Sequence, residues 1–569
     1  MSGLLSSFMI KTSFLATCVY TLANLVLSGP QTLTARERRP RLRLSDVSID
    51  ELLHELQERR LTSVQLVEMY IDRTQEVNSK VHAISEINPD ALAIARERDI
   101  EREKDQIRGI LHGVPILLKD VISTTDSMAT TAGFEGLLGA KPALEATVVR
   151  KLREEGAIIL GKATMSEWLN FRSPGIAPNG WSPVGGQCAG IFCENQDAGG
   201  SSTGSAVATA LGLAAAALGT ETSGSIATPA RSCGLIGLKP TAGLTSRDGV
   251  FIANEYQDSV GVLSQTVKDA ALILTAIADT SDKDACEKID PRDLYRTIPP
   301  IGKTNFTDSC TSSGLKGLRI AVARHVMKRD EFATEKFEEA LITMKSLGAT
   351  IVDNVEFSSW TLNMSKRFGD KWKLASRLLL KQTHSPSVTD IESFLESFSE
   401  NPQGLHTLDD VRNYTRECSK EKAGLYQLTE LDMAAQQAQK YDMASDEYQE
   451  SLLLRLSMGK ELGNLLDHYK CDLLVAPAWT ETAANVGGCP QVSVPLQAYP
   501  KDWPLKKMHN GFISTGPNIP TGILFVGRRW DDARVIGASY AFEQATHYRR
   551  TFKPIICPSA DFHDIKAML

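Results

Sequence analysis

Apolar residues recur along the chain with two different periods, and each period predicts its own kind of element. Residues 45–80 place apolar side chains at helical spacing, and Thr62 and Ser63 stand where a helix would begin. The runs 113–122 and 157–162 are short, apolar and start at or just after a glycine. Such runs indicate strands that are buried on both faces.

The rest of the chain continues this alternation. The Ala-rich segment 201–221 has small residues throughout and predicts one helix that is buried on most sides. Residues 360–470 are charged and favour helices, with little sign of strands. Further strands are expected at 317–324, 349–355, 471–478, 490–496 and 521–530, and further helices at 146–155, 334–347 and 532–548. This alternation predicts an α/β fold, and we expect a single domain over residues 45–560 because no long linker interrupts it.

The first 44 residues differ from the rest. Residues 1–28 contain one charged residue, Lys11, ahead of an apolar stretch that ends in small residues, which is the pattern of a secretory signal peptide. Residues 29–44 form a basic tail. We therefore expect a secreted protein. The alternative is an intracellular protein with a poorly ordered or membrane-associated N-terminus, and the apolar stretch is short for a spanning helix.

Composition narrows the classes of function. The net charge of −7 predicts a soluble acidic protein and argues against binding to nucleic acid, which requires clustered lysine and arginine. The ten cysteines contain no CxxC pair, so no zinc site is expected, and the nine that follow Cys18 do not imply a full set of disulfides. Glycosylation triplets begin at Asn305, Asn363 and Asn413 and are compatible with secretion.

Two short motifs suggest other chemistries, and their surroundings argue against both. GAIILGKAT at 156–164 is close to a phosphate-binding loop, but Ala163 stands where a magnesium-binding hydroxyl is needed. GSSTG at 200–204 matches a nucleophile elbow with Ser202 at its centre. An elbow needs a strand directly before it, whereas the preceding CENQDAG is polar, and the later histidines have no distinctive setting.

A lysine offers a third route to an active serine. A serine hydroxyl is a poor nucleophile until a base accepts its proton. Lys119 ends the apolar run VPILL, so its amine would lie in a low-dielectric site, where burial favours the neutral form. The alternative is an ordinary surface lysine at a strand end whose amine reaches water.

Blocks of sequence between residues 117 and 528 follow one known order and spacing. They are LLKD (117–120), TTAG (130–133), GKATMSEW (161–168), DAGGSSTGS (197–205), GTETSGSIATPARSCGLIGLKPT (219–241), QDSVGVLSQTVKDAA (257–271), DLLVAP (472–477), GCPQVSVP (488–495) and GILFVGR (522–528). In these blocks the chain resembles the amidase signature family over residues 45–555, most closely its fungal and bacterial amidases. The resemblance implies a large, mostly mixed β-sheet covered by helices on both faces, and an enzyme that hydrolyses amide bonds.

The same resemblance implies a catalytic set of two serines and a lysine. Carried onto this chain, Ser225 is the nucleophile that forms an acyl-enzyme, and Lys119 is the base. Ser201, which the resemblance places after a cis peptide bond from Gly200, bridges the two. Neither a metal nor a cofactor is implied.

The resemblance also implies an oxyanion hole made by the backbone N–H groups of Thr222, Ser223, Gly224 and Ser225. Ser202 is expected beside this substrate-binding loop, where its hydroxyl would order the loop by hydrogen bonding. A packing serine with no further role is the alternative for Ser202.

One departure from the family pattern bears on the substrate. Several relatives carry arginine, near the acid group of their substrates, where this chain has Ala227. The absence of that arginine implies that the acyl portion of the substrate is neutral or apolar. The helical region at 360–430 is expected to cover the pocket.

The expected partner is a small-molecule amide, with no nucleic acid and no stable protein partner, in a monomer or homodimer. Ester hydrolysis is expected as a side reaction, because an ester's leaving group needs less help from a proton donor. A scaffold that has lost catalysis is the non-enzymatic alternative. The presence of Lys119, Ser201 and Ser225 together argues against it.

Overall fold

The computed structural model describes residues 42–254, 257–278, 304–327, 330–357, 385–440, 445–446, 449, 453, 458–477 and 481–562. The described residues after Leu42 belong to one compact unit, Arg43–Leu569. The expected signal peptide and nearly all of the basic tail lie outside the described residues. None of the helices in the described ranges combines the length and the hydrophobicity that a membrane span requires.

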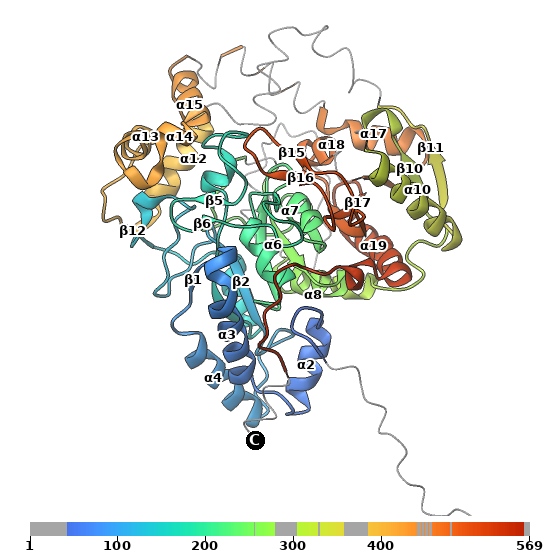
Figure 1. The fold of residues 1–569 in the computed structure, drawn as a ribbon, viewed down its shortest axis with the longest axis horizontal. Coiled ribbons are helices and arrows are strands. Elements are labelled where there is room, and N and C mark those ends of the chain that lie inside the picture. Colours follow the sequence, from blue (N-terminus) through green and yellow to red (C-terminus); the bar gives the residue numbers. More distant parts are fainter. Residues whose placement is uncertain are drawn as a thin grey trace, which may run out of the picture. The chain divides into compact units, whose positions relative to one another are not determined.

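An eleven-stranded mixed sheet forms the centre of the unit Arg43–Leu569 (Figure 1). In order across the sheet, its strands are β1 (Ile84–Ile87), β4 (Ile158–Ala163), β2 (Pro115–Lys119), β7 (Ala216–Glu221), β9 (Ser259–Ser264), β8 (Ile236–Lys239), β14 (Gln491–Ala498), β17 (Pro520–Val526), β13 (Leu473–Pro477), β10 (Arg319–Val322) and β11 (Thr350–Asp353). Three two-stranded sheets pair β12 (Phe398–Glu400) with β3 (Lys141–Pro142), β15 (Lys506–Lys507) with β16 (Ile513–Thr515), and β5 (Trp181–Ser182) with β6 (Gly186–Gln187).

Helices connect these strands along the whole described chain. They are α2 (Ile49–Gln57), α3 (Ser63–Val81), α4 (Ala91–Glu103), α5 (Thr147–Glu154), α6 (Thr203–Ala210), α7 (Ala227–Ser232), α8 (Val267–Ile277), α10 (Glu331–Ser346), α12 (Ser385–Glu396), α13 (Leu408–Glu417), α14 (Ala423–Tyr426), α15 (Thr429–Lys440), α17 (Glu461–His468), α18 (Glu481–Val486) and α19 (Asp532–Thr546). Short 3₁₀ turns lie at η1 (Glu135–Leu137), η2 (Glu167–Asn170), η3 (Phe306–Ser309), η4 (Arg324–Val326), η5 (Ser419–Glu421) and η6 (Tyr548–Thr551). The α/β class and the large mixed sheet are therefore confirmed.

Most of the expected elements are confirmed close to their predicted positions. Thr62, rather than Ser63, caps α3: its hydroxyl accepts the N–H of Gln65, whose side chain in turn accepts the N–H of Thr62. The strands expected at 113–122 and 157–162 are β2 and β4, and every residue of both is buried. The part of the expected helical region that spans 360–384 lies outside the described residues.

The expected single helix over 201–221 is wrong. Helix α6 ends at Ala210, and the second half of the segment forms the central strand β7. Gly212 has a φ of +64°, and a Cβ there would lie 2.4 Å from the carbonyl oxygen of Leu44. Alanine favours a helix locally, but pairing with β2 on one side and β9 on the other decides the structure of 216–221.

The direction of the strands brings two chain ends to the same edge of the sheet. Strand β2 runs parallel to β7, with Leu118 opposite Leu218. Lys119 is the last residue of β2, and Glu221 is the last residue of β7. Because carboxyl ends of neighbouring parallel strands meet at one edge, this is where the fold gathers polar side chains for chemistry.

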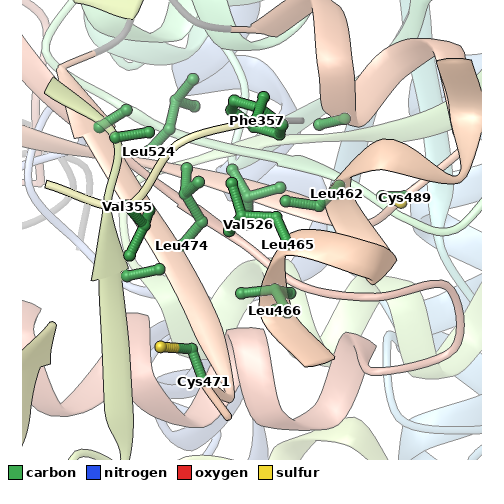
Figure 2. Packing of buried hydrophobic residues seen from close by; sticks show 14 of the residues in the cluster. Val355, Phe357, Leu462, Leu465, Leu466, Cys471, Leu474, Cys489, Leu524 and Val526 are labelled. Carbon is green, nitrogen blue, oxygen red and sulfur yellow. The ribbon is translucent and has the colours of Figure 1, made fainter. Parts of the chain in front are cut away.

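A cluster of buried apolar residues packs around β13, β17 and α17 (Figure 2). Leu465 of the helix lies against Leu474 and Val526 of the strands, and Phe357 closes one side. The cluster also includes Ala227, only 1% exposed, which follows the catalytic serine expected from the sequence by two residues.

Candidate active site

A buried lysine lies at the centre of the site. Lys119 is fully buried, and its Nζ lies 2.8 Å from Ser201 Oγ, 3.0 Å from Thr220 Oγ1 and 3.2 Å from the Thr220 carbonyl oxygen. Burial lowers the pKa of Lys119 to about 7, although the carboxylates of Asp258 and Glu221 raise it in part. The amine is therefore poised between its charged and neutral forms near neutral pH.

The loop before α6 presents Ser201 to this lysine. The Gly200–Ser201 peptide bond is cis, as the family resemblance implies. The carbonyl oxygen of Ser201 accepts a hydrogen bond from the N–H of Ser166 at 3.1 Å. Gly199 adopts a φ of +74°, and a Cβ there would lie 2.9 Å from the backbone nitrogen of Pro229, so only glycine fits without a shift of the backbone.

Ser202 joins the two serine-bearing loops. Its hydroxyl donates to the carbonyl oxygen of Thr220 at 3.2 Å, and its N–H donates to the carbonyl oxygen of Ser225 at 3.2 Å. Ser202 is fully buried and occupies the N-cap position of α6 without a capping side-chain hydrogen bond. No strand directly precedes it, so the structure lacks the strand–turn–helix setting of a nucleophile elbow. These bonds are those expected of a residue that orders the loop.

Ser225 lies in the turn between β7 and α7. It is 9% exposed, and its hydroxyl forms no hydrogen bond with any described residue. The structure thus brings Lys119 and Ser201 into contact, while the hydroxyls of Ser201 and Ser225 are not hydrogen-bonded to each other. Ser223 is exposed beside them.

The turn also contains the expected oxyanion donors. Within the described part of the chain, the N–H groups of residues 222–225 donate no hydrogen bond to the protein. They remain available to an oxygen of a bound substrate, and this is the property that an oxyanion hole needs.

Three further polar residues of the site were not expected from the sequence. Thr220 accepts and orients the amine of Lys119, and Asp258 and Glu221 are buried carboxyls that act on its charge. Asp258 accepts the N–H of Ala253 at 2.6 Å, and burial raises its pKa to about 6. A signal was present, because both acidic residues adjoin buried strands: Glu221 ends β7 and Asp258 directly precedes β9. Their partners, however, are remote in sequence.

The near match to a phosphate loop has a different structure. Residues 158–163 form strand β4, and Lys162 within it is fully buried. Its amine donates to the carbonyl oxygen of Ile122 and to Thr130 Oγ1, both at 2.7 Å. A buried strand offers no cradle of N–H groups to a phosphate, so the rejection of this motif is confirmed.

A buried ion cluster attaches helices α12–α15 to the core near the site. The guanidinium of Arg172 pairs with Glu167 and, at 2.6 Å, with Glu421 of η5. Burial raises the pKa of both carboxyls. Ser166, which is adjacent to Glu167, holds the carbonyl of Ser201. The helical segment is thereby linked through few residues to the loop that carries Ser201.

A cavity of about 330 Å³ lies apart from these residues. Asp269 and Glu543 line it, and burial raises their pKa values to about 7 and about 8. Lys119, Ser201 and Ser225 do not line it. The assignment of the active site therefore depends on the contacts of the buried lysine and the two serine loops, and not on cavity volume.

The described ranges contain neither a metal-binding cluster nor a disulfide. No three of their His, Cys, Asp or Glu side chains are grouped so that they could hold a metal ion. The eight described cysteines are all free thiols. Asn305 and Asn413 of the glycosylation triplets are exposed, and Asn363 lies outside the described residues.

Known proteins resemble the chain over most of its length. Residues 65–536 match the family model described as Amidase. The "Putative amidase" of Arthroderma benhamiae is 38% identical over 509 residues, which cover 88% of this chain and 82% of the relative. A probable amidase of Arabidopsis thaliana is 34% identical over 516 residues, which cover 89% of this chain and 91% of the relative. Among solved structures, that of native peptide amidase from Stenotrophomonas maltophilia matches this chain with a TM-score of 0.76 and 32% sequence identity. The match covers 90% of this chain and 99% of the peptide amidase chain.

Proposed function

The chain belongs to the amidase family and hydrolyses amide bonds, and we propose that it does so through an acyl-enzyme formed on Ser225. The contact of Lys119 with Ser201 supports this proposal most directly, because it pairs a hydroxyl with an amine whose pKa burial has brought to about 7. A neutral amine is a base that can activate a serine near neutral pH. The proposed catalytic set is Ser225, Ser201 and Lys119.

In the proposed reaction, neutral Lys119 takes the proton of Ser201 while Ser201 takes the proton of Ser225, and Ser225 Oγ attacks the amide carbonyl carbon. Hydrogen bonds between catalytic groups often tighten only when the substrate binds, so we expect the Ser201–Ser225 contact to form then. The free N–H groups of residues 222–225 would stabilise the negative oxygen that develops, and each would lower the barrier by about 3 kcal/mol.

The second half of the reaction returns the proton. Charged Lys119 would give it back through Ser201 to the leaving nitrogen, because an amine leaves poorly unless it is protonated. Water then attacks the ester on Ser225 by the same route and frees the acid. The proposed steps use no metal and no cofactor.

The acyl side of the substrate is proposed to be neutral or apolar. Ala227 is buried among the apolar residues of the β13–β17–α17 cluster and contributes no charge that could bind an acid group. Helices α12–α15, attached by Arg172, are proposed to cover the pocket. Because a solved relative is named a peptide amidase, a peptide amide is the substrate class to test first.

The proposal extends to the setting of the enzyme. Residues 1–28 support secretion, and the acidic net charge supports a small-molecule substrate rather than nucleic acid. A monomer or homodimer is proposed. N-terminal sequencing of protein from the culture medium tests secretion. A protein that stays inside the cell with residues 1–28 still attached would contradict it.

Labelling with a fluorophosphonate, followed by mass spectrometry of the modified peptide, tests the catalytic assignment. We expect label on Ser225 in the wild type and in the matched control Ser202→Ala, and none in Ser225→Ala. Label on Ser202 would favour the nucleophile elbow instead. A folded wild-type protein that takes no label would favour a scaffold without catalysis.

A further inference from the structure

We propose that Glu221 is a positioning residue that fixes the peptide unit after Ser225 and thereby decides which N–H groups face the substrate. The proposal deepens the function proposed above and rests on Ser225 as the nucleophile. It concerns a carboxylate that takes no part in the proton transfers, lies at the end of β7 and is fully buried.

Glu221 reaches across the turn to the residues that follow the nucleophile. Its Oε2 accepts the N–H of Ile226 at 2.7 Å and the N–H of Ala227 at 2.9 Å. Hydrogen bonds to an ionised acceptor are shorter and stronger than those between neutral groups. A buried carboxylate would therefore hold both amides firmly.

The peptide unit between Ser225 and Ile226 is consequently held at both ends. The carbonyl oxygen of this unit, which belongs to Ser225, accepts the N–H of Ser202 at 3.2 Å. The N–H of the unit, which belongs to Ile226, donates to Glu221. Rotation of this unit would break both bonds. The backbone that bears the nucleophilic side chain is thus anchored to the bridging-serine loop on one side and to β7 on the other.

The second carboxylate oxygen is anchored in turn. Gln491 of β14 donates its amide Nε2 to Glu221 Oε1 and also, at 3.1 Å, to Asn485 Oδ1. All three side chains are fully buried. Because β14 lies inside the eleven-stranded sheet, the orientation of Glu221 is tied to the interior of that sheet.

This arrangement separates two sets of N–H groups. Those of Ile226 and Ala227 are occupied by Glu221, so they cannot turn toward a substrate oxygen. Those of residues 222–225 have no acceptor within the described part of the protein. Glu221 thereby sets the composition of the oxyanion hole without contacting the substrate.

The test compares the rate of fluorophosphonate labelling in wild type and in Glu221→Gln between pH 5 and 9. Glutamine has the same shape, but it loses the charge and turns a donor toward the donor of Gln491. We expect the maximal labelling rate to fall about 100-fold while the probe affinity changes little, because a misplaced nucleophile lowers reactivity more than binding. The acid limb of the pH profile should also move to lower pH, since Glu221 is one of the two carboxylates that raise the pKa of Lys119.

Asp258→Asn is the matched comparison. Asp258 also raises the pKa of Lys119, but it does not bind the N–H groups of Ile226 and Ala227. It should move the acid limb in the same direction with a smaller loss of maximal rate than Glu221→Gln. A merely structural role of Glu221 would leave the acid limb of its variant where it is in wild type.

A second variant serves if Glu221→Gln fails to fold. In Glu221→Gln/Gln491→Glu the donor and acceptor exchange places, so the hydrogen bond between the two side chains is restored. If the single variant folds, the labelling rate of the double variant should be at least tenfold higher than that of Glu221→Gln. If the single variant does not fold, the double variant should be labelled above the background of the unfolded protein. Wild type without label on Ser225 would overturn the proposed function. Wild type labelled on Ser225, with a folded Glu221→Gln that reacts within about threefold of it and keeps its acid limb, would overturn the role of Glu221 alone.

Discussion

Replacing Lys119 with methionine should change the free energy of unfolding in a way that depends on pH. In the folded protein burial lowers the pKa of this lysine from 10.5 to about 7. Between these values the unfolded chain binds a proton that the folded chain does not, so the stability of the wild type rises with pH. Below about pH 7 both states are protonated, and the folded protein bears the full cost of a buried ammonium. The methionine variant bears no such cost at any pH.

The magnitude follows from the shift of about 3.5 pKa units, each worth 1.36 kcal/mol, so the full cost is about 5 kcal/mol. Methionine also removes the hydrogen bonds to Ser201 and Thr220, and their loss lowers the stability of the variant. That loss does not depend on the titration of the lysine. We therefore expect the stability of wild type relative to Lys119→Met to rise by about 2.5 kcal/mol between pH 7.5 and 9.5.

Urea unfolding at several pH values, with refolding verified, measures this difference. Lys162→Met is the comparison, because burial lowers the pKa of Lys162 to about 8, and its difference should begin to rise about one pH unit higher. A difference for Lys119→Met that stays constant from pH 7.5 to 9.5 would show that the lysine titrates alike in both states. It would refute the argument that burial prepares this amine as a base.

Three further predictions concern the site and its attachment. The value of kcat/KM on an uncharged amide should fall about tenfold per pH unit below about pH 7, as Lys119 becomes charged, and an optimum on the acid side of neutrality would instead indicate carboxylate chemistry. Ala227→Arg should lower the free energy of unfolding by about 3–5 kcal/mol, because it places an unpaired cation in an apolar cluster; an unchanged Tm by calorimetry would show that the side chain escapes to water. Arg172→Leu should destabilise the protein by about 3–5 kcal/mol near pH 8, since Glu167 and Glu421 then face each other unpaired. This loss should shrink toward pH 5, because protonation of carboxyls with raised pKa values removes the repulsion, and equal losses at both pH values would contradict that cause.

Local pattern was sufficient for most elements and for the identity of the catalytic candidates. Strand β2 is recognisable because its apolar run is short and follows a glycine, and the position of Lys119 at its end is enough to predict a buried amine. The family blocks add the roles expected of Ser201 and Ser225. The cis bond before Ser201 and the contact of that serine with the lysine agree with those roles.

Other features were decided only by residues that are remote in sequence. Residues 216–221 favour a helix on their own, and they form a strand because β2 and β9 supply hydrogen-bond partners on both sides. Glu221 looks like any acidic residue at the end of a strand until Gln491, 270 positions away, and the turn after Ser225 come to lie around it. The period of apolar residues is a property of neighbours along the chain, and it therefore determined which segments fold as which element. The environment of a buried charge depends on every segment packed against it, so the partners of Lys119, Glu221 and Arg172 were decided by the tertiary structure.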